Sequence, residues 1–184
     1  MTTLLLGLVI FFGIHLLPVY PNVRGRLLER FGENGYKGIF ALIAMLGLIL
    51  IVIGMGRRQV VPVWEPPVFL DHLAIVVMLP VFIFLAATYI PCNMKRFTRH
   101  PMLWGVTFWA SAHLLANGDL GSIILFGSFL AYSLFDMWSA NRRGAEKSIT
   151  VRPVIYDALV AAIGIIAYVI FFLLHPYMFG VSII

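Results

Sequence analysis

The side chains that could bind a ligand gather in one stretch of the sequence, from Arg99 to Asp119. This stretch contains two histidines, His100 and His113, which are thirteen residues apart. At about 1.5 Å and 100° per helical residue, they would lie roughly 20 Å apart along a helix axis. One small ligand therefore cannot contact both, and we expect the stretch to contribute to two different places in the protein.

His113 is a candidate cofactor ligand because of its neighbours on a helix. Trp109 would lie one turn before it and Asn117 one turn after it. An imidazole between tryptophan and aliphatic side chains is a reasonable axial ligand for a planar cofactor. The alternative is an interhelical hydrogen bond from a buried histidine. His15, alone on an apolar segment, allows the same two interpretations.

Other kinds of chemistry have weaker support. A metal site formed by His72, His113 and His175 would lack the closely spaced ligand pairs that are typical of metal motifs. The sequence contains no phosphate-binding glycine loop, serine nucleophile motif or cysteine-pair motif. Its one cysteine, Cys92, cannot form an intrachain disulfide and is more typical of apolar packing than of redox chemistry.

The composition predicts that a membrane surrounds these side chains. The chain has 184 residues, of which 61% are hydrophobic and 11% are charged. A soluble domain carries about 45–50% apolar and about 25% charged residues. The length suits one domain, so we expect a single all-α transmembrane domain over residues 1–184.

Six apolar segments predict a bundle of six transmembrane helices, at residues 3–17, 38–56, 68–90, 101–116, 120–138 and 153–174. Residues 18–37 carry apolar side chains at helical spacing and are predicted to lie on the membrane surface. Gly47 and Gly54 predict close helix packing. Asp119 is the predicted cap of the fifth helix, and we expect the sixth to close at His175-Pro176.

The basic residues predict a topology. Of the 13 lysines and arginines, all except Arg57 and Arg58 fall in the loops after the first, third and fifth helices. Positively charged loops face the cytoplasm, so both termini are expected outside it. This bias also explains the net charge of +5 without a nucleic-acid partner.

The same topology predicts a polar mouth on the cytoplasmic side. Eight residues could gather there: His15, Arg24, Arg99, His100, Asp136, Asn141, Arg142 and Asp157. Their mixture of charges and hydrogen-bond donors suits an anionic or nucleotide-like ligand. The alternative is that the arginines only anchor the topology and the aspartates are their counter-ions.

Three motifs together resemble the NnrU family of bacterial membrane proteins over nearly the whole chain. They are HLLPVYPNVRGRLLERFGENGYKGIFAL from His15, RHPMLWG…W…AHLLANGD from Arg99 to Asp119, and NRR at residues 141–143. The family takes its name from an association with nitrite and nitric oxide reduction genes. It is similar to zeta-carotene isomerase, a membrane enzyme that holds haem b and isomerises a polyene. The resemblance implies haem b, with His15 and His113 as the axial ligands of its iron.

The R-H-P-x-x-x-G pattern also resembles isoprenylcysteine carboxyl methyltransferases. That resemblance implies that Arg99 and His100 bind S-adenosylmethionine. Those enzymes carry paired glutamates near the C-terminal end, whereas only Glu146 follows Arg142 and Arg143 here.

Together these patterns favour a multi-pass protein of the bacterial inner membrane that binds haem b and is associated with denitrification. An S-adenosylmethionine-dependent membrane methyltransferase and a polyene isomerase are the enzymatic alternatives. A non-catalytic assembly or regulatory factor is the third. The expected partners are the lipid bilayer and either a membrane redox complex or a hydrophobic small molecule.

Overall fold

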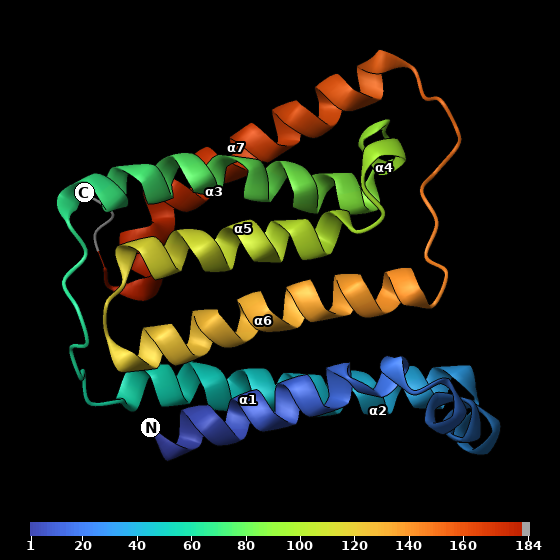
Figure 1. Cartoon of the computed structure of the whole chain (residues 1–184), viewed down its shortest axis with the longest axis horizontal. Coiled ribbons are helices and arrows are strands. Elements are labelled where there is room, and N and C mark those ends of the chain that lie inside the picture. The colour runs from blue at the N-terminus through green and yellow to red at the C-terminus, as the bar shows by residue number, and fades with distance from the viewer. Residues whose placement is uncertain (182–184) are drawn as a thin grey trace. The chain divides into compact units, whose positions relative to one another are not determined.

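The computed structural model describes residues 1–181, and no β-strand occurs among them. In chain order the elements are α1 (Thr2–His15), the 3-10 helix η1 (Leu17–Val19), α2 (Pro21–Arg57), α3 (Val68–Tyr89), α4 (Met94–Phe97), α5 (Pro101–Ala116), α6 (Leu120–Arg142) and α7 (Val154–Phe179) (Figure 1). The predicted all-α membrane fold is thus confirmed, with a helix at each of the six apolar segments.

Five of these helices are long and apolar enough to cross a membrane: α1 extended by η1, α2, α3, α6 and α7. The sixth predicted span, α5, has 16 residues. At about 1.5 Å per residue it is about 24 Å long, which is less than the roughly 30 Å of a bilayer's hydrocarbon core. A multi-pass membrane protein follows from the five long helices.

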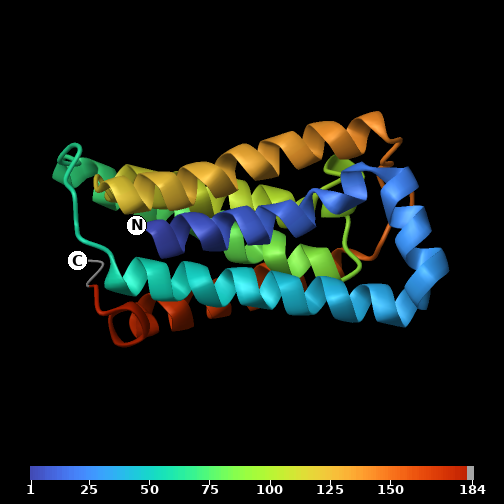
Figure 2. The ribbon, with the colours of Figure 1, turned by 90° about the horizontal axis from the view of Figure 1, so that it is seen from below.

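Helix α2 begins much earlier than the sequence pattern indicated. It starts at Pro21 and changes direction at Gly32, whose φ of 69° lies in the region that favours glycine. The segment before Gly32 lies across the end of the long second segment (Figure 2). The amphipathic stretch predicted for the membrane surface is therefore a helix of its own, joined to the apolar segment by the turn at Gly32.

Helix α7 does not end at His175-Pro176 but continues to Phe179, so that predicted end is wrong. A proline lacks only its own backbone N–H, and the later N–H groups of the last turn can still bond. The N–H of Gly180 donates to the carbonyl of Pro176 at 2.9 Å, and Gly180 ends the helix with a φ of 68°.

Contacts within the chain define two compact units, and the first consists of residues 1–63 and 119–128. Here α1 packs against α2 through glycines. A Cβ atom built on Gly7 would lie 2.6 Å from the backbone nitrogen of Ile51, and one on Gly47 would lie 2.7 Å from that of Phe11. Gly54 approaches the backbone of Leu4 in the same way. The predicted close packing at Gly47 and Gly54 is confirmed.

The second unit consists of residues 64–118 and 129–184, described to residue 181, and in it α3 packs against both α5 and α7 (Figure 1). Gly164 allows α7 to approach Ile83, whose Cα would lie 2.7 Å from an added Cβ. Cys92 is buried together with Ala87 and Val160, as expected for a packing cysteine. A single domain for the whole chain stays a prediction.

Candidate functional site

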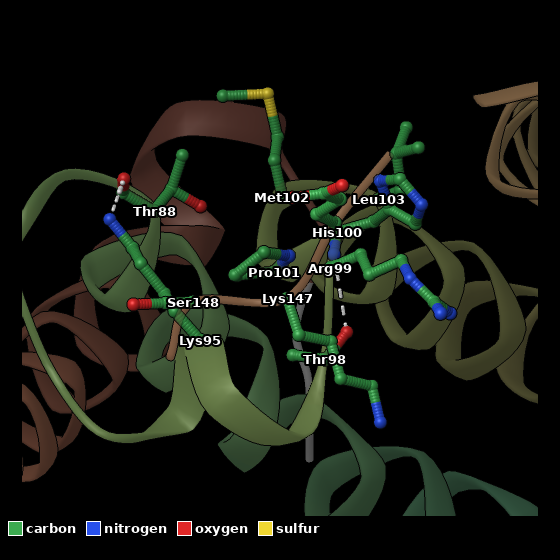
Figure 3. A pocket seen from close by; sticks show the side chains of 11 residues that line it. Thr88, Lys95, Thr98, Arg99, His100, Pro101, Met102, Leu103, Lys147 and Ser148 are labelled. Atoms are coloured by element: carbon green, nitrogen blue, oxygen red, sulfur yellow. Dashed lines mark hydrogen bonds between the residues drawn. The ribbon is translucent and has the colours of Figure 1, made fainter. Parts of the chain in front are cut away.

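A pocket of about 590 Å³ lies in the second unit, where α3 and α6 end and α5 begins (Figure 3). Its lining consists of Thr88, Lys95, Thr98, Arg99, His100, Pro101, Met102, Leu103, Glu146, Lys147 and Ser148. We call it the Arg99 pocket. Two residues of the predicted polar mouth, Arg99 and His100, therefore line this pocket.

The turn into α5 fixes His100 at one wall of the pocket. The hydroxyl of Thr98 accepts a hydrogen bond from the His100 backbone N–H at 3.2 Å. Pro101 then begins the helix, where its missing N–H costs no helical hydrogen bond. Nε2 of His100 donates to Oδ1 of Asn141 at 3.0 Å, which joins the start of α5 to the last turn of α6.

Lys95 closes the end of the pocket that is nearest to α3. Its Nζ donates to the carbonyl of Thr88 in the last turn of α3 at 2.8 Å, a favourable position for a cation. Its own carbonyl accepts from the N–H of Ser148 at 3.0 Å. This bond holds the loop after α6 against α4 and so places Lys147 at the pocket.

Asn93 joins the start of α4 to the start of α7. Its backbone N–H and its side-chain amide both donate to the carboxylate of Asp157, at 2.7 and 2.6 Å. Its side chain also exchanges hydrogen bonds with the backbone of Arg152. Asp157 thus acts in a structural junction and is not part of the pocket lining.

The remaining members of the predicted mouth have other contacts. Asp136 forms an ion pair with Arg143 at 3.4 Å, and the guanidinium of Arg142 lies over the ring of Trp138, 4.6 Å from its centre. His15 and Arg24 belong to the first unit, where Arg24 lies over the ring of Tyr36.

His15, at the end of α1, has aromatic surroundings. Its ring stacks on Phe11 with 4.1 Å between ring centres and meets Phe40 edge-on at 5.1 Å. Its Nδ1 lies 2.6 Å from the carbonyl oxygen of Phe11, one turn earlier. With Nδ1 as the donor, the lone pair of this imidazole resides on Nε2.

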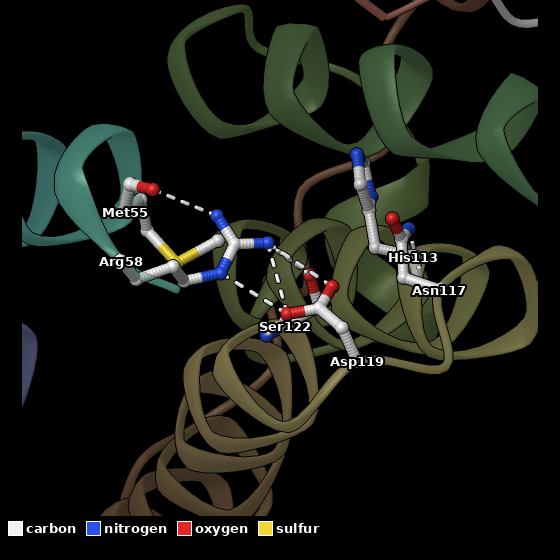
Figure 4. A network of polar contacts seen from close by, with 6 residues as sticks. All are labelled: Met55, Arg58, His113, Asn117, Asp119 and Ser122. Carbon is white, nitrogen blue, oxygen red and sulfur yellow. Dashed lines mark hydrogen bonds and ion pairs between the residues drawn. The ribbon is translucent and has the colours of Figure 1, made fainter. Parts of the chain in front are cut away.

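His113, in the last turn of α5, has the same arrangement. Its Nδ1 lies 2.8 Å from the carbonyl oxygen of Trp109, whose ring centre is 5.2 Å away. Trp109 in turn meets Phe129 edge-on. The amide of Asn117 donates to the carbonyl of His113, so this turn is fixed on both sides (Figure 4).

The other two histidines also bond through Nδ1 to a carbonyl oxygen. His72 bonds to Val68, one turn earlier, in an exposed position. His175 is half-buried and bonds to Val181, six residues later, and its ring centre lies 4.9 Å from that of Phe179. Within residues 1–181, no three histidine, cysteine or acidic side chains are grouped so that they could hold a metal ion. The three-histidine metal site considered above therefore has no support.

An ion pair holds the start of α6 in the first unit (Figure 4). Asp119 accepts from Arg58 at both carboxylate oxygens, at 2.9 and 3.0 Å, and Arg58 also donates to the carbonyl of Met55. The N–H of Ser122 donates to Asp119 at 3.1 Å, which confirms the predicted helix cap. Burial alone would raise the pKa of Asp119, but the bonds from Ser122 and Arg58 hold it below its usual value.

Sequence reasoning missed two lysines that line the Arg99 pocket and the asparagine that joins α4 to α7. Lys95 and Lys147 were interpreted only as charges that set the topology, although their places beside R-H-P and N-R-R already put them near the predicted mouth. Asn93 gave no signal, because its partners lie about sixty residues away in the sequence.

Comparison with protein families shows that the family model described as NnrU protein matches residues 3–183. No curated protein and no solved structure matches the chain.

Proposed function

The chain belongs to the NnrU family, and on that premise we propose that it is a haem b protein of the bacterial inner membrane. His15 and His113 are the proposed axial ligands, and the proposed role is in nitrite and nitric oxide metabolism. Two observations carry the ligand assignment, and both residues share them: Nδ1 is hydrogen-bonded to the carbonyl one turn earlier, and the ring contacts an aromatic side chain.

This hydrogen bond fits a ligand of haem iron. A histidine that binds a metal usually donates its other ring N–H to a carbonyl or carboxylate, which fixes the tautomer and makes the ligating nitrogen more basic. In His15 and His113 the donor is Nδ1, so Nε2 is the nitrogen that can coordinate iron. The peptide carbonyls of Phe11 and Trp109 therefore orient the two rings.

The surroundings of the two histidines also fit a planar apolar cofactor. Phe11 and Phe40 flank His15, and Trp109 flanks His113. Aromatic side chains offer flat apolar surface and exclude water from a porphyrin edge. His72 makes the same Nδ1 bond in an exposed position, and His175 bonds instead to a carbonyl six residues later, so neither is assigned as a ligand.

Haem b with two histidine ligands would supply reversible one-electron chemistry. The chain's own contribution would be to hold each imidazole in one tautomer and to shield it from water. The role in nitrite and nitric oxide metabolism rests on membership of the family and on the association that gives the family its name.

The test is an absorbance spectrum of the full chain, purified in detergent from cells supplied with a haem precursor. We expect a Soret band and, after reduction, the sharp α band of six-coordinate low-spin haem b. His15→Ala and His113→Ala should each lose this low-spin spectrum, and added imidazole should restore part of it.

His72→Ala and His175→Ala are the controls: His72 makes the same Nδ1 bond to the carbonyl one turn earlier, and His175 bonds through Nδ1 to a later carbonyl. We expect both controls to keep the wild-type spectrum and haem content. If the His15 and His113 variants fold and keep a low-spin spectrum, these residues are not the ligands.

The metabolic role needs a separate measurement. Membranes from a strain that lacks this chain should consume nitrite or nitric oxide more slowly, and the wild-type chain should restore the rate. Restoration by His113→Ala to the wild-type rate would contradict a role for the proposed haem.

A further inference from the structure

We propose that the Arg99 pocket binds the phosphate group of an anionic phospholipid. This site is separate from the two proposed haem ligands, because neither His15 nor His113 lines the pocket. The proposal rests on the charge of the lining, on the apolar side chains at its edge and on its place beside the helix ends.

The lining has an excess of positive charge. Lys95, Arg99 and Lys147 line the pocket together with a single carboxylate, that of Glu146. Within residues 1–181, none of the three cations forms an ion pair. The cavity therefore has a net charge of about +2 from these groups, and an anion is the ligand that such a site favours.

The lining also offers the hydrogen bonds that a phosphate group accepts. The Arg99 guanidinium provides a planar set of N–H donors, and the ammonium groups of Lys95 and Lys147 provide further donors. Lys95 uses one of its three protons for the carbonyl of Thr88 and keeps two for a ligand. The first turn of α5 adds its partial positive charge to these side chains.

Apolar side chains beside the cations favour a lipid over a soluble phosphate. Met102 lines the pocket and is 41% exposed, while Phe97 is 75% exposed directly before the lining residue Thr98. Ile149 is 93% exposed directly after Ser148. Exposed apolar groups next to cations are the pattern of a surface at the boundary between lipid headgroups and acyl chains.

The place of the pocket agrees with that boundary. Helices α3, α6 and α7 are candidate spans, and the pocket lies where α3 and α6 end (Figure 3). Every lysine and arginine of the second unit's described residues lies at these helix ends: Lys95, Arg96, Arg99, Arg142, Arg143, Lys147 and Arg152. Basic pockets between helix ends on the cytoplasmic side are suited to anionic lipid headgroups.

The experiment titrates phosphatidylglycerol against the full chain in a neutral detergent and counts the bound lipid by native mass spectrometry. Phosphatidylcholine is the neutral lipid for comparison, and inorganic phosphate and S-adenosylmethionine are the soluble competitors. We expect one phosphatidylglycerol to bind more tightly than phosphatidylcholine. Neither soluble competitor should displace it at equal concentration.

The variants test the cations directly. A basic side chain near an anionic headgroup is worth about fivefold in affinity, so Arg99→Gln with Lys147→Gln should weaken phosphatidylglycerol binding about 25-fold. Arg96→Gln with Arg152→Gln removes two cations from the same end of the unit but outside the lining, and should change binding less than about twofold. Glu146→Gln should tighten binding several-fold, a gain that a misfolded chain cannot imitate.

Three outcomes would overturn the proposal. Equal loss in the two double variants would mean a general surface attraction rather than a pocket. Equal binding of phosphatidylcholine would exclude recognition of the anionic headgroup. Displacement of phosphatidylglycerol by inorganic phosphate or S-adenosylmethionine, with the same dependence on Arg99, would assign the pocket to a soluble ligand. None of these outcomes bears on the haem spectrum, so the two proposals fail independently.

Discussion

The ion pair between Arg58 and Asp119 allows a quantitative prediction of stability. The side chains of Arg58 and Asp119 are only 16% and 14% exposed. Exposed ion pairs contribute about 0–1 kcal/mol, whereas breaking a buried pair by removing one partner costs about 3–5 kcal/mol. Replacing Arg58 by methionine removes the guanidinium and leaves Asp119 with its hydrogen bonds from Ser122. We therefore expect Arg58→Met to destabilise the protein by about 3 kcal/mol.

The assay is thermal unfolding of the full chain in detergent, followed by circular dichroism. For a chain of this length, about 3 kcal/mol corresponds to a decrease in Tm of about 6–12 °C. Arg57→Met is the matched control: Arg57 is the preceding residue, is exposed and forms no ion pair within the described chain. We expect the control to shift Tm by less than about 2 °C.

A double-mutant cycle separates the ion pair from the helix cap. Asp119→Asn keeps a good cap for α6 but loses the charge, and we expect a loss of about 2 kcal/mol. The Arg58→Met and Asp119→Asn double variant should lose clearly less than the sum of the single losses. Additive losses, or an Arg58→Met variant as stable as the Arg57 control, would refute the structural reasoning.

Three further predictions concern the same fold. The pKa of Asp119 is lowered in the folded chain, so the stability that its carboxylate contributes is complete above its unfolded pKa of about 3.9 and is lost as the pH falls through the lower folded pKa. In acid titration, Asp119→Asn should therefore lose less stability than the wild type below about pH 4. Identical titration curves would contradict this. Gly54→Ala should destabilise the chain by at least about 1 kcal/mol, because the new methyl group would meet the backbone of Leu4. Gly13 has open space around it, so Gly13→Ala should be neutral or stabilising in the same unfolding assay. Thr107→Val should cost about 1 kcal/mol because it removes a buried hydrogen bond of 2.9 Å to the hydroxyl of Ser133, and an unchanged Tm would argue against that bond.

The sequence predicted those parts of the fold that depend on residues within one helical turn of each other. The cap of α6 at Asp119 and the start of α5 at Pro101 depend on neighbours within one turn, and both are confirmed. The Gly47 and Gly54 spacing correctly predicted close helix packing, but the partner helix came only from the structure. The helical spacing of apolar side chains in residues 18–37 indicated an amphipathic segment, but not that it joins the apolar helix through a turn at Gly32.

Partners that are distant in the sequence could not be derived in this way. Arg58 and Asp119 are 61 residues apart, so the sequence indicated a helix cap but not the guanidinium that binds it. Arg99 and His100 of the R-H-P motif line the Arg99 pocket, and ligand binding by these two residues stays a prediction. The other lining cations come from α4 and from the loop after α6, and only the fold places them there. The pairing of His15 with His113 on one haem stays a prediction.

The measurement that tests the haem proposal most directly is the reduced-minus-oxidised spectrum of the purified full chain, wild type against His113→Ala, with His175→Ala as the control. We predict the α band of low-spin haem b in the wild type and in the control, and its loss in His113→Ala. A folded wild-type chain that takes up no haem when it is supplied, or a His113→Ala variant with the wild-type spectrum, would contradict the proposed function.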